Sequence, residues 1–552
     1  MKNLKLLLIA AVCVLTGTIK TNAQCDPGDT VMVTLGDTIM DIAPKALNNV
    51  VHFYKTASDS DRVIFLMPGL GGDQNAWQDV HDETDGVTNE DPLYAARKAE
   101  VVKFGEPNGP GYTEAAGLAA AGGDIYDDMV IQNLAFSPPN RENNIAIGHS
   151  QGGLALRATD YYMRNTSGKN PQFGGLVTFG SAHQGAEILT NGLPASMGGQ
   201  GMIGDMANEM CDDLLAGPLS EAIYGSNAFY AKLVRLLNID DDILDAKTAF
   251  CDFVTGDSVL SVVAASVTPN ITTDYMAHNE NYSGSNYLLN TLNSYAPNIP
   301  MVAFYGEEEE PVFWRQMGSL RKGVYTYNAF QADPDQQHVD DANDMRINYY
   351  TKYLIYKGHA EWQQNQIDKI ANMWHYFFNP VSTIIQLNIH TSKRTRYLKV
   401  MGDYHVGYDF LKNTNKQWKA IIGAYKTNVQ QNGYICECEE LNGGNGVSIN
   451  WVATAAECPP GVTYLPGGIK RICLRYPNIE TVVTHKPSDG IVLAESAKNL
   501  PGATVNPALS DDDYKLENTN HQQLRNSSET REKLNRLFDY NDYSNFFITK
   551  PR

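Results

Sequence analysis

The chain of 552 residues has fewer basic than acidic residues and lacks a long apolar run beyond its N-terminus. It holds 43 Lys and Arg against 63 Asp and Glu, a formal net charge of −20. Such an acidic chain is poorly suited to bind nucleic acid, and its overall charge also opposes simple electrostatic adhesion to anionic lipid. No later segment approaches the roughly 18 unbroken apolar residues of a membrane-spanning helix, so no integral membrane span is expected.

Cysteine is also scarce, and its spacing is not that of a zinc ribbon. Eight cysteines occur: Cys13, Cys25, Cys211, Cys251, Cys436, Cys438, Cys458 and Cys473. The Cys-x-Cys pair with distant single partners fits zinc poorly, which favours disulfides in an oxidising compartment. Cys211 could pair with Cys251, and the four later cysteines could pair among themselves, but the connectivity does not follow from the sequence.

The N-terminal segment has the pattern of a secretory signal. Lys2 and Lys5 precede an apolar stretch at 6–14, and Thr21-Asn22-Ala23 supplies small residues before Gln24. This pattern predicts a signal peptide over 1–23 and a secreted, periplasmic or cell-surface protein. An uncleaved anchor is the alternative interpretation.

Short apolar runs rich in β-branched and aromatic residues alternate with helical patterns over much of the chain. Such alternation predicts an α/β fold with a mostly parallel sheet covered by helices on both faces. The expected strands are 62–67, 100–104, 144–147, 175–179, 300–305 and 479–484. The expected helices are 125–134, 154–162 and 528–538.

Two long interruptions divide this pattern. Residues 186–298 have a helical and loop-like pattern and are expected to form a lid-like insertion. Residues 311–477 contain an amphipathic helical stretch at 347–378 and then the cysteine-bearing part, which predicts a second insertion of α+β structure with disulfides. The rest of 24–310, together with 478–552, has a usual size for one α/β domain.

The segment Gly148-His149-Ser150-Gln151-Gly152 has the pattern Gly-x-Ser-x-Gly. In a nucleophile elbow this pattern holds a serine hydroxyl above a sheet, on a strained turn between a strand and a helix. The pattern is permissive by itself. Here an apolar strand is predicted just before it and a helix just after it, so we expect Ser150 to be a nucleophile.

A second glycine-rich segment, Pro68-Gly69-Leu70-Gly71-Gly72, follows the predicted strand 62–67. Acyl transfer needs two backbone N–H groups that stabilise the oxyanion. One is expected from the residue after the nucleophile, Gln151, and the other from this loop, at Leu70. An ordinary tight turn is the alternative interpretation of the loop.

The chain resembles lipases and esterases of the α/β-hydrolase fold. The resemblance lies in the segments FLMPGLGG (65–72), GHSQGG (148–153), TFGSAHQGA (178–186), SGSNYL (283–288) and SDGIV (488–492). It covers the predicted core, roughly half of the chain, and neither insertion. Pro68 departs from the pattern, because many lipases carry histidine there.

A triad in the order serine, acid, histidine needs two further residues. Asp489 in Ser-Asp-Gly-Ile-Val resembles the Asp-Gly-x-Val that supplies the acid in many lipases, whereas Glu307–Glu310 directly follow a predicted strand and are the alternative. His521 is the single histidine after Asp489, so we expect it to be the base.

These residues predict a serine carboxylic ester hydrolase that acts on a small-molecule or lipid ester. An acyltransferase with the same triad and a non-catalytic binding protein at the cell surface are the alternatives. No cofactor motif occurs, and Gly69–Gly72 lacks the spacing of a phosphate loop. Two acidic groups that could bind a metal such as calcium are more typical of solvated loops: His338, Asp340, Asp341 and Asp344, and Asp240–Asp242.

Overall fold

The computed structural model describes part of the chain, and it divides that part into two compact units. One unit comprises 1–423 and 487–552, and the other comprises 424–486. The described residues are 31–35, 38–42, 50–54, 62–69, 76, 77, 80, 99–104, 122–127, 129, 144–192, 201–215, 287–310, 312–321, 336–372, 380–442, 445–454, 456, 457, 460–466, 469–504, 506–537 and 543.

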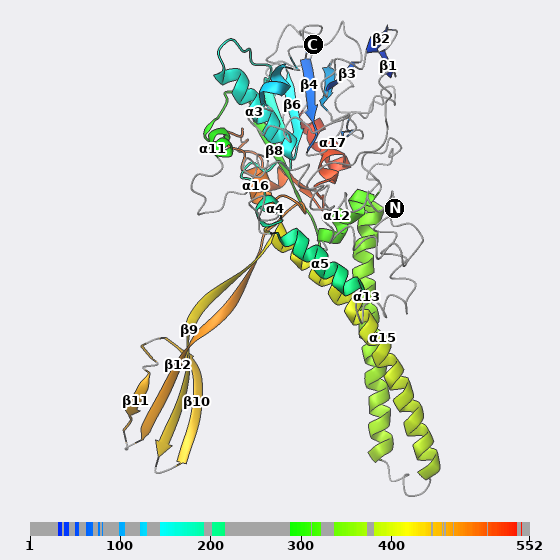
Figure 1. Cartoon of the computed structure of the whole chain (residues 1–552), viewed down its shortest axis with the longest axis vertical. Helices are drawn as coiled ribbons and strands as arrows, with labels where there is room; N and C mark the ends of the chain where they lie inside the picture. The colour runs from blue at the N-terminus through cyan, green and yellow to red at the C-terminus, as the bar shows by residue number, and fades with distance from the viewer. Residues whose placement is uncertain are drawn as a thin grey trace. The chain divides into compact units, whose positions relative to one another are not determined.

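A seven-stranded sheet forms the centre of the first unit (Figure 1). Its strand order is β13-β8-β7-β6-β4-β5-β3. Every neighbouring pair is parallel except β3 and β5, which are antiparallel. The strands are β3 (Val50–Tyr54), β4 (Arg62–Met67), β5 (Ala99–Phe104), β6 (Ile145–His149), β7 (Gly175–Phe179), β8 (Met301–Glu307) and β13 (Lys515–Glu517).

The central strands are mostly apolar because both of their faces are covered. Every residue of β6 and β7 is buried. Helix α3 (Gln151–Asn165) begins directly after β6 and buries Leu154 and Leu156. The rings of Phe179 on β7 and Phe304 on β8 stack with centroids 4.9 Å apart. This packing makes the carboxyl end of β6 a rigid support for the turn that follows.

The structure confirms the predicted fold class, a mostly parallel sheet of the α/β-hydrolase type. Five of the six predicted strands are β4 to β8, with ends that differ by at most two residues. The predicted sixth strand, 479–484, is extended but lies in β12 (Lys470–His485) of the second unit, where it pairs with β9 (Tyr425–Asn442). The sheet instead ends with β13, a three-residue strand too short to leave a periodic pattern.

Between β8 and residue 423, the described part of the first unit contains the helices α12 (Val312–Arg321), α13 (Gln336–Asn372) and α15 (Pro380–Ile421). The predicted helix at 347–378 corresponds to α13, which begins earlier, and 373–378 lie outside the described residues. The rings of Tyr356 on α13 and Tyr404 on α15 stack with centroids 5.6 Å apart. Near their opposite ends Trp362 and His390 are in contact, so the two helices pack antiparallel side by side (Figure 1).

The second unit is an antiparallel sheet of strand order β10-β9-β12-β11. Its strands are β9 (Tyr425–Asn442), β10 (Asn445–Ala453), β11 (Gly461–Tyr464) and β12. A disulfide joins Cys438 on β9 to Cys473, the residue paired with it on β12, and Cys436 is disulfide-bonded as well. The predicted insertion 311–477 thus contains two structures, because α12, α13 and α15 belong to the first unit.

The predicted lid-like insertion, 186–298, is described in three helical pieces. They are α4 (Glu187–Gly192), α5 (Met202–Leu215) and α11 (Tyr287–Ser294). The rest of that insertion, the predicted signal peptide at 1–23, Cys25 and Cys251 lie outside the described residues. A role as a lid stays a prediction.

Candidate active site

Ser150 occupies the strained turn that the sequence pattern predicts. It lies between the last residue of β6 and the first of α3, with φ 53° and ψ −127°. A non-glycine residue rarely adopts a positive φ, and such strain is typical of functional sites. Gly152 allows the turn to approach the loop after β4, since a Cβ at that position would lie 2.1 Å from the Pro68 carbonyl oxygen. The surrounding backbone therefore forces the serine out of an ordinary conformation.

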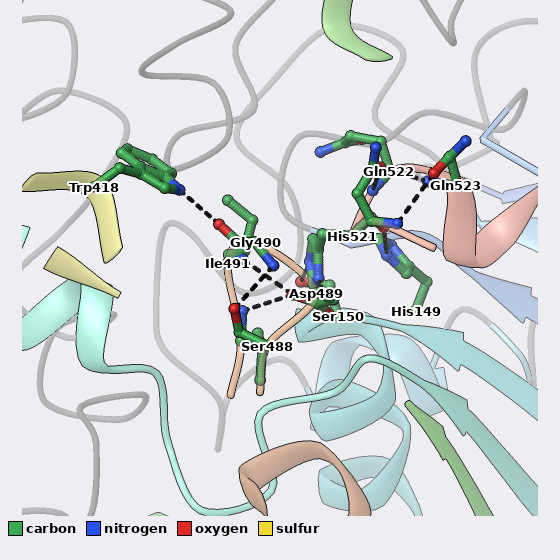
Figure 2. Close-up of polar contacts among 12 residues, drawn as sticks. His149, Ser150, Trp418, Ser488, Asp489, Gly490, Ile491, His521, Gln522 and Gln523 are labelled. Carbon is green, nitrogen blue, oxygen red and sulfur yellow. Dashed lines mark hydrogen bonds and ion pairs between the residues drawn. The ribbon is translucent and has the colours of Figure 1, made fainter. Parts of the chain in front are cut away.

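The structure brings Ser150, His521 and Asp489 together in one hydrogen-bonded chain (Figure 2). His521 Nε2 lies 2.8 Å from Ser150 Oγ, and His521 Nδ1 lies 2.7 Å from Asp489 Oδ2. The carboxylate can only accept, so Nδ1 carries the proton and Nε2 is left to accept from the serine hydroxyl. Both His521 and Asp489 are buried. This arrangement can remove a proton from Ser150 and keep the imidazole oriented while it does so.

A tight turn orients Asp489 in the segment Ser488-Asp489-Gly490-Ile491-Val492. The backbone N–H groups of Ile491 and Val492 donate to Asp489 Oδ1 at 3.0 and 2.7 Å. The Asp489 carbonyl accepts from the backbone N–H of His521 at 2.7 Å. On the outer side of the turn, Trp418 Nε1 of α15 donates to the Gly490 carbonyl at 2.8 Å. The carboxylate thus has one oxygen committed to the turn and the other directed at the histidine.

The loop that carries His521 is held by hydrogen bonds from its own side chains and from the elbow. Asn520 Oδ1 accepts from the backbone N–H groups of Gln522 and Gln523 at 3.0 and 3.1 Å. His149 Nε2 donates to the His521 carbonyl at 2.8 Å. Burial, together with the neighbouring His521 and Arg525, holds the pKa of His149 well below its ordinary value. His149 is therefore a neutral hydrogen-bond donor that holds the backbone of His521 in place.

The alternative acids, Glu307–Glu310, have other partners. The Glu308 side chain is fully buried and forms an ion pair with Arg315 of α12 at 2.5 Å. Burial raises the pKa of Glu308 to about 7, against the opposing effect of Arg315. Glu310 interacts with Lys419 of α15. Among the described contacts of this run none reaches His521, so the geometry favours Asp489 as the triad acid.

The two predicted oxyanion donors are placed differently. Gln151 is the first residue of α3, where backbone N–H groups lack partners within the helix and favour negative charge. Leu70 lies outside the described residues. Its neighbour Gly69 packs directly on the nucleophile, since a Cβ added there would lie 2.7 Å from Ser150 Cβ. The loop after β4 thus reaches the serine, and the assignment of Leu70 stays a prediction.

Sequence reasoning missed three features that support the site. In the pattern Gly-x-Ser-x-Gly, His149 is only a variable position, and the pattern does not indicate its hydrogen bond to His521. Gly180, just after β7, has φ 57°, and a Cβ there would lie 2.9 Å from Asp489 Oδ2. The Glu308–Arg315 pair connects to both triad loops, because the Glu308 N–H donates to the Ser488 carbonyl and Arg315 donates to Asn518 Oδ1. The available signal was the position of His149, Gly180 and Glu308 at or just after the carboxyl ends of β6, β7 and β8.

Other site types were sought in the described part of the chain. It contains no group of three or more His, Cys, Asp or Glu that could hold a metal ion. None of the helices that it includes combines the length and the hydropathy that crossing a bilayer would need. His183 of the segment TFGSAHQGA is buried between Thr178 and Arg157, which is a structural role.

Comparison with known proteins finds distant likeness only. No family model and no curated protein matches the chain. One similar solved structure is RedJ with a polyethylene glycol molecule bound in its active site, at 15% identity and a TM-score of 0.22, covering 48% of this chain and 80% of that one. Another is the proline iminopeptidase of Mycobacterium smegmatis, at 14% identity and a TM-score of 0.20, covering 58% and 98%. The fold assignment rests on the strand order and on the elbow at Ser150.

Proposed function

We propose that this protein is an exported serine hydrolase that cleaves carboxylic esters through an acyl-enzyme on Ser150. The observation that carries this function is the continuous chain of hydrogen bonds from Ser150 Oγ through His521 to Asp489, at 2.8 and 2.7 Å. A serine hydroxyl alone is a weak nucleophile at neutral pH, and an adjacent oriented base is what activates it.

In the proposed reaction Ser150 Oγ attacks the ester carbonyl carbon while its proton passes to His521 Nε2. The imidazolium then donates this proton to the leaving alcohol oxygen as the carbon–oxygen bond breaks, which leaves the acyl group on Ser150. A water molecule, deprotonated by His521 in the same way, attacks the acyl-enzyme and releases the carboxylic acid. Asp489 stabilises the imidazolium in both half-reactions.

Oxyanion stabilisation in this scheme comes from backbone N–H groups at Gln151 and in the loop that contains Leu70. The N-terminus of α3 lies directly behind the nucleophile, so its helix dipole adds to this stabilisation. The predicted signal peptide supports export, and the helical insertion at 186–298 is the candidate wall for an acyl chain.

The test combines covalent labelling with turnover. A fluorophosphonate probe should label the purified chain, and it should not label Ser150→Ala. An excess of nitrophenyl ester present during the labelling reaction should slow the labelling of the unaltered chain. A panel of nitrophenyl esters from acetyl to palmitoyl should then identify the preferred acyl length. Failure of the probe to label well-folded protein at Ser150 would overturn the enzymatic function and favour a non-catalytic binding protein.

A labelled ester offered together with an alcohol separates hydrolysis from acyl transfer. Hydrolysis releases free acid at a rate that the alcohol does not change. Accumulation of a new ester at the expense of free acid would instead replace the hydrolase with an acyltransferase that uses the same three residues.

A further inference from the structure

The beginning of α15 exposes large aliphatic side chains that a helix normally buries. Val381, Ile384, Ile385 and Ile389 are exposed to 67, 47, 53 and 47%. Their spacing of three, one and four residues places them on one side of the helix. An amphipathic helix usually turns such a stripe towards a core, so a contiguous exposed stripe indicates a surface that meets something else.

The opposite side of α15 is already occupied by α13. Thr383 is buried, His390 Nδ1 lies 2.6 Å from Gln363 Oε1, and the Tyr397 ring contacts His359. The aliphatic stripe therefore faces away from the contact between the two helices. Packing within the helix pair does not account for it.

Basic residues continue the same side of α15 after the aliphatic stripe. Lys393, Arg396 and Lys399 are exposed, and Arg396 lies two helical turns beyond Ile389 on the same face. Together with Arg394 they are the four charged residues between Pro380 and Gly402, a stretch without an acidic residue in a chain of net charge −20. The local charge of this face is thus opposite to that of the whole molecule.

We propose that the outward face of α15, residues 381–399, docks on an anionic phospholipid surface. Aliphatic side chains enter the boundary between headgroups and acyl chains, while a following group of Lys and Arg binds phosphate headgroups, as in helices that lie in a membrane interface. The net charge of the chain opposes adhesion by overall charge. Electrostatic attraction acts within about a Debye length of the surface, so the local group of basic residues decides whether this face is attracted.

Two other occupants fit the features less well. A soluble polyanion would be held by the basic residues and would leave the four aliphatic side chains in water. A second copy of this chain could cover the stripe with its own exposed aliphatic residues, but pairing stripe to stripe would bring two groups of basic residues to one interface. An anionic lipid surface accommodates both the aliphatic residues and the basic residues of this face.

Vesicle sedimentation with the full chain tests this docking. Vesicles of phosphatidylcholine mixed with phosphatidylglycerol should bind the protein, vesicles of phosphatidylcholine alone should bind it weakly, and added salt should release it. The triple variants Ile384→Gln/Ile385→Gln/Ile389→Gln and Lys393→Gln/Arg396→Gln/Lys399→Gln should each lower the partition coefficient about tenfold or more.

Matched control variants change the same residue types elsewhere on the helix pair. Exposed aliphatic residues of α13 are replaced in Ile347→Gln/Leu354→Gln/Ile355→Gln, and exposed lysines in Lys357→Gln/Lys412→Gln/Lys416→Gln. Both controls should change vesicle binding by less than about threefold. Circular dichroism verifies that the helix content of all four variants is intact.

Several results would overturn lipid docking. The first two are absence of binding to either kind of vesicle and an equal loss of vesicle binding in the control variants. A dimer in light scattering that the α15 variants abolish would favour a second copy of the chain. Heparin binding that the isoleucine variant leaves unchanged would favour a soluble polyanion. Hydrolysis of a short soluble ester is measured in parallel and should not change in any variant. Absence of ester hydrolysis in the unaltered chain would contradict the proposed enzymatic function, but it would not affect the conclusion from vesicle binding.

Discussion

Two segments that carry carboxylates, Glu307–Glu310 and Ser488–Leu493, contact each other near Ser150 and direct their carboxylates at different partners. The Glu308 N–H donates to the Ser488 carbonyl at 2.8 Å, so the segments are neighbours. Yet Asp489 faces His521, whereas the buried Glu308 faces Arg315. The difference shows that closeness to the site does not make a carboxylate a triad acid. What decides is whether its backbone turn directs an oxygen at the imidazole.

The largest expected effect comes from Asp489→Asn. Asparagine keeps the shape of the turn but cannot stabilise an imidazolium and favours the wrong tautomer of His521, so kcat/KM should fall about a thousandfold or more. Kinetics with a nitrophenyl ester measure this, and urea unfolding verifies that the fold persists. Retention of more than a tenth of the activity would return the Glu307–Glu310 run to the position of candidate acid.

Glu308→Gln should affect stability more than chemistry. The change leaves the Arg315 guanidinium buried without its carboxylate, which costs about 3 kcal/mol of the free energy of unfolding. In the protein that remains folded, kcat should fall less than tenfold, because His521 keeps Asp489. Denaturant unfolding and active-site titration with a fluorophosphonate separate the two quantities. A loss of kcat comparable to that of Asp489→Asn would contradict the division of roles.

His149→Gln tests the hydrogen bond from His149 to the His521 carbonyl through the pH dependence of the free energy of unfolding. The pKa of His149 is lowered in the folded state, so the neutral form is the one that folding favours. Below pH about 6.5 the unfolded chain takes up a proton that the folded chain does not, and stability falls as the pH falls. Glutamine can donate to the His521 carbonyl without titrating. As the pH falls below about 6.5, the free energy of unfolding of the variant should therefore fall less steeply than that of the wild type, by up to about 1.4 kcal/mol per pH unit.

Urea unfolding of both proteins at several pH values between 7.5 and 5 measures this difference. The control is His359→Gln, a change of an exposed histidine on α13, which should leave the wild-type slope unchanged. Identical slopes for wild type and His149→Gln would show that His149 is not the neutral buried donor described above.

The smallest effect is expected from Glu309→Gln. Glu309 is exposed and lies between the two glutamates that have fixed partners. Its replacement should change the free energy of unfolding by no more than about 0.5 kcal/mol and should leave kcat/KM unaltered. Thermal unfolding and ester kinetics suffice as measurements, and a clear loss in either would mean that charge in this run matters beyond its two paired members.

Much of the fold was predictable because strands buried on both faces leave long apolar runs. The strands β4, β6, β7 and β8 have that pattern, and the helices α3 and α17 (Ser528–Asn535) lie where they were expected. The membership of 479–484 was not predictable in this way. Its β-branched residues suit an exposed antiparallel ribbon as well as a sheet edge, and only the pairing with β9 assigns it.

The candidate site was predictable at the level of residue types and their order. Gly-x-Ser-x-Gly between a strand and a helix pointed to Ser150, and the order of the chain left His521 as the base. The supporting contacts were not predictable, because Glu308, Arg315 and His149 act through partners far away in the sequence. A run of four glutamates looks solvated, whereas one of its members is fully buried.

The sequence alone predicted the parallel sheet and the candidates for nucleophile, acid and base, since these depend on local steric demands and on burial patterns that repeat along the chain. The tertiary structure decided which carboxylate meets His521, since hydrogen bonds between loops act over distances that no local pattern records. It also decided that the aliphatic side chains at the start of α15 face away from α13. Spacing predicts that such residues share a face, but only packing determines what that face meets.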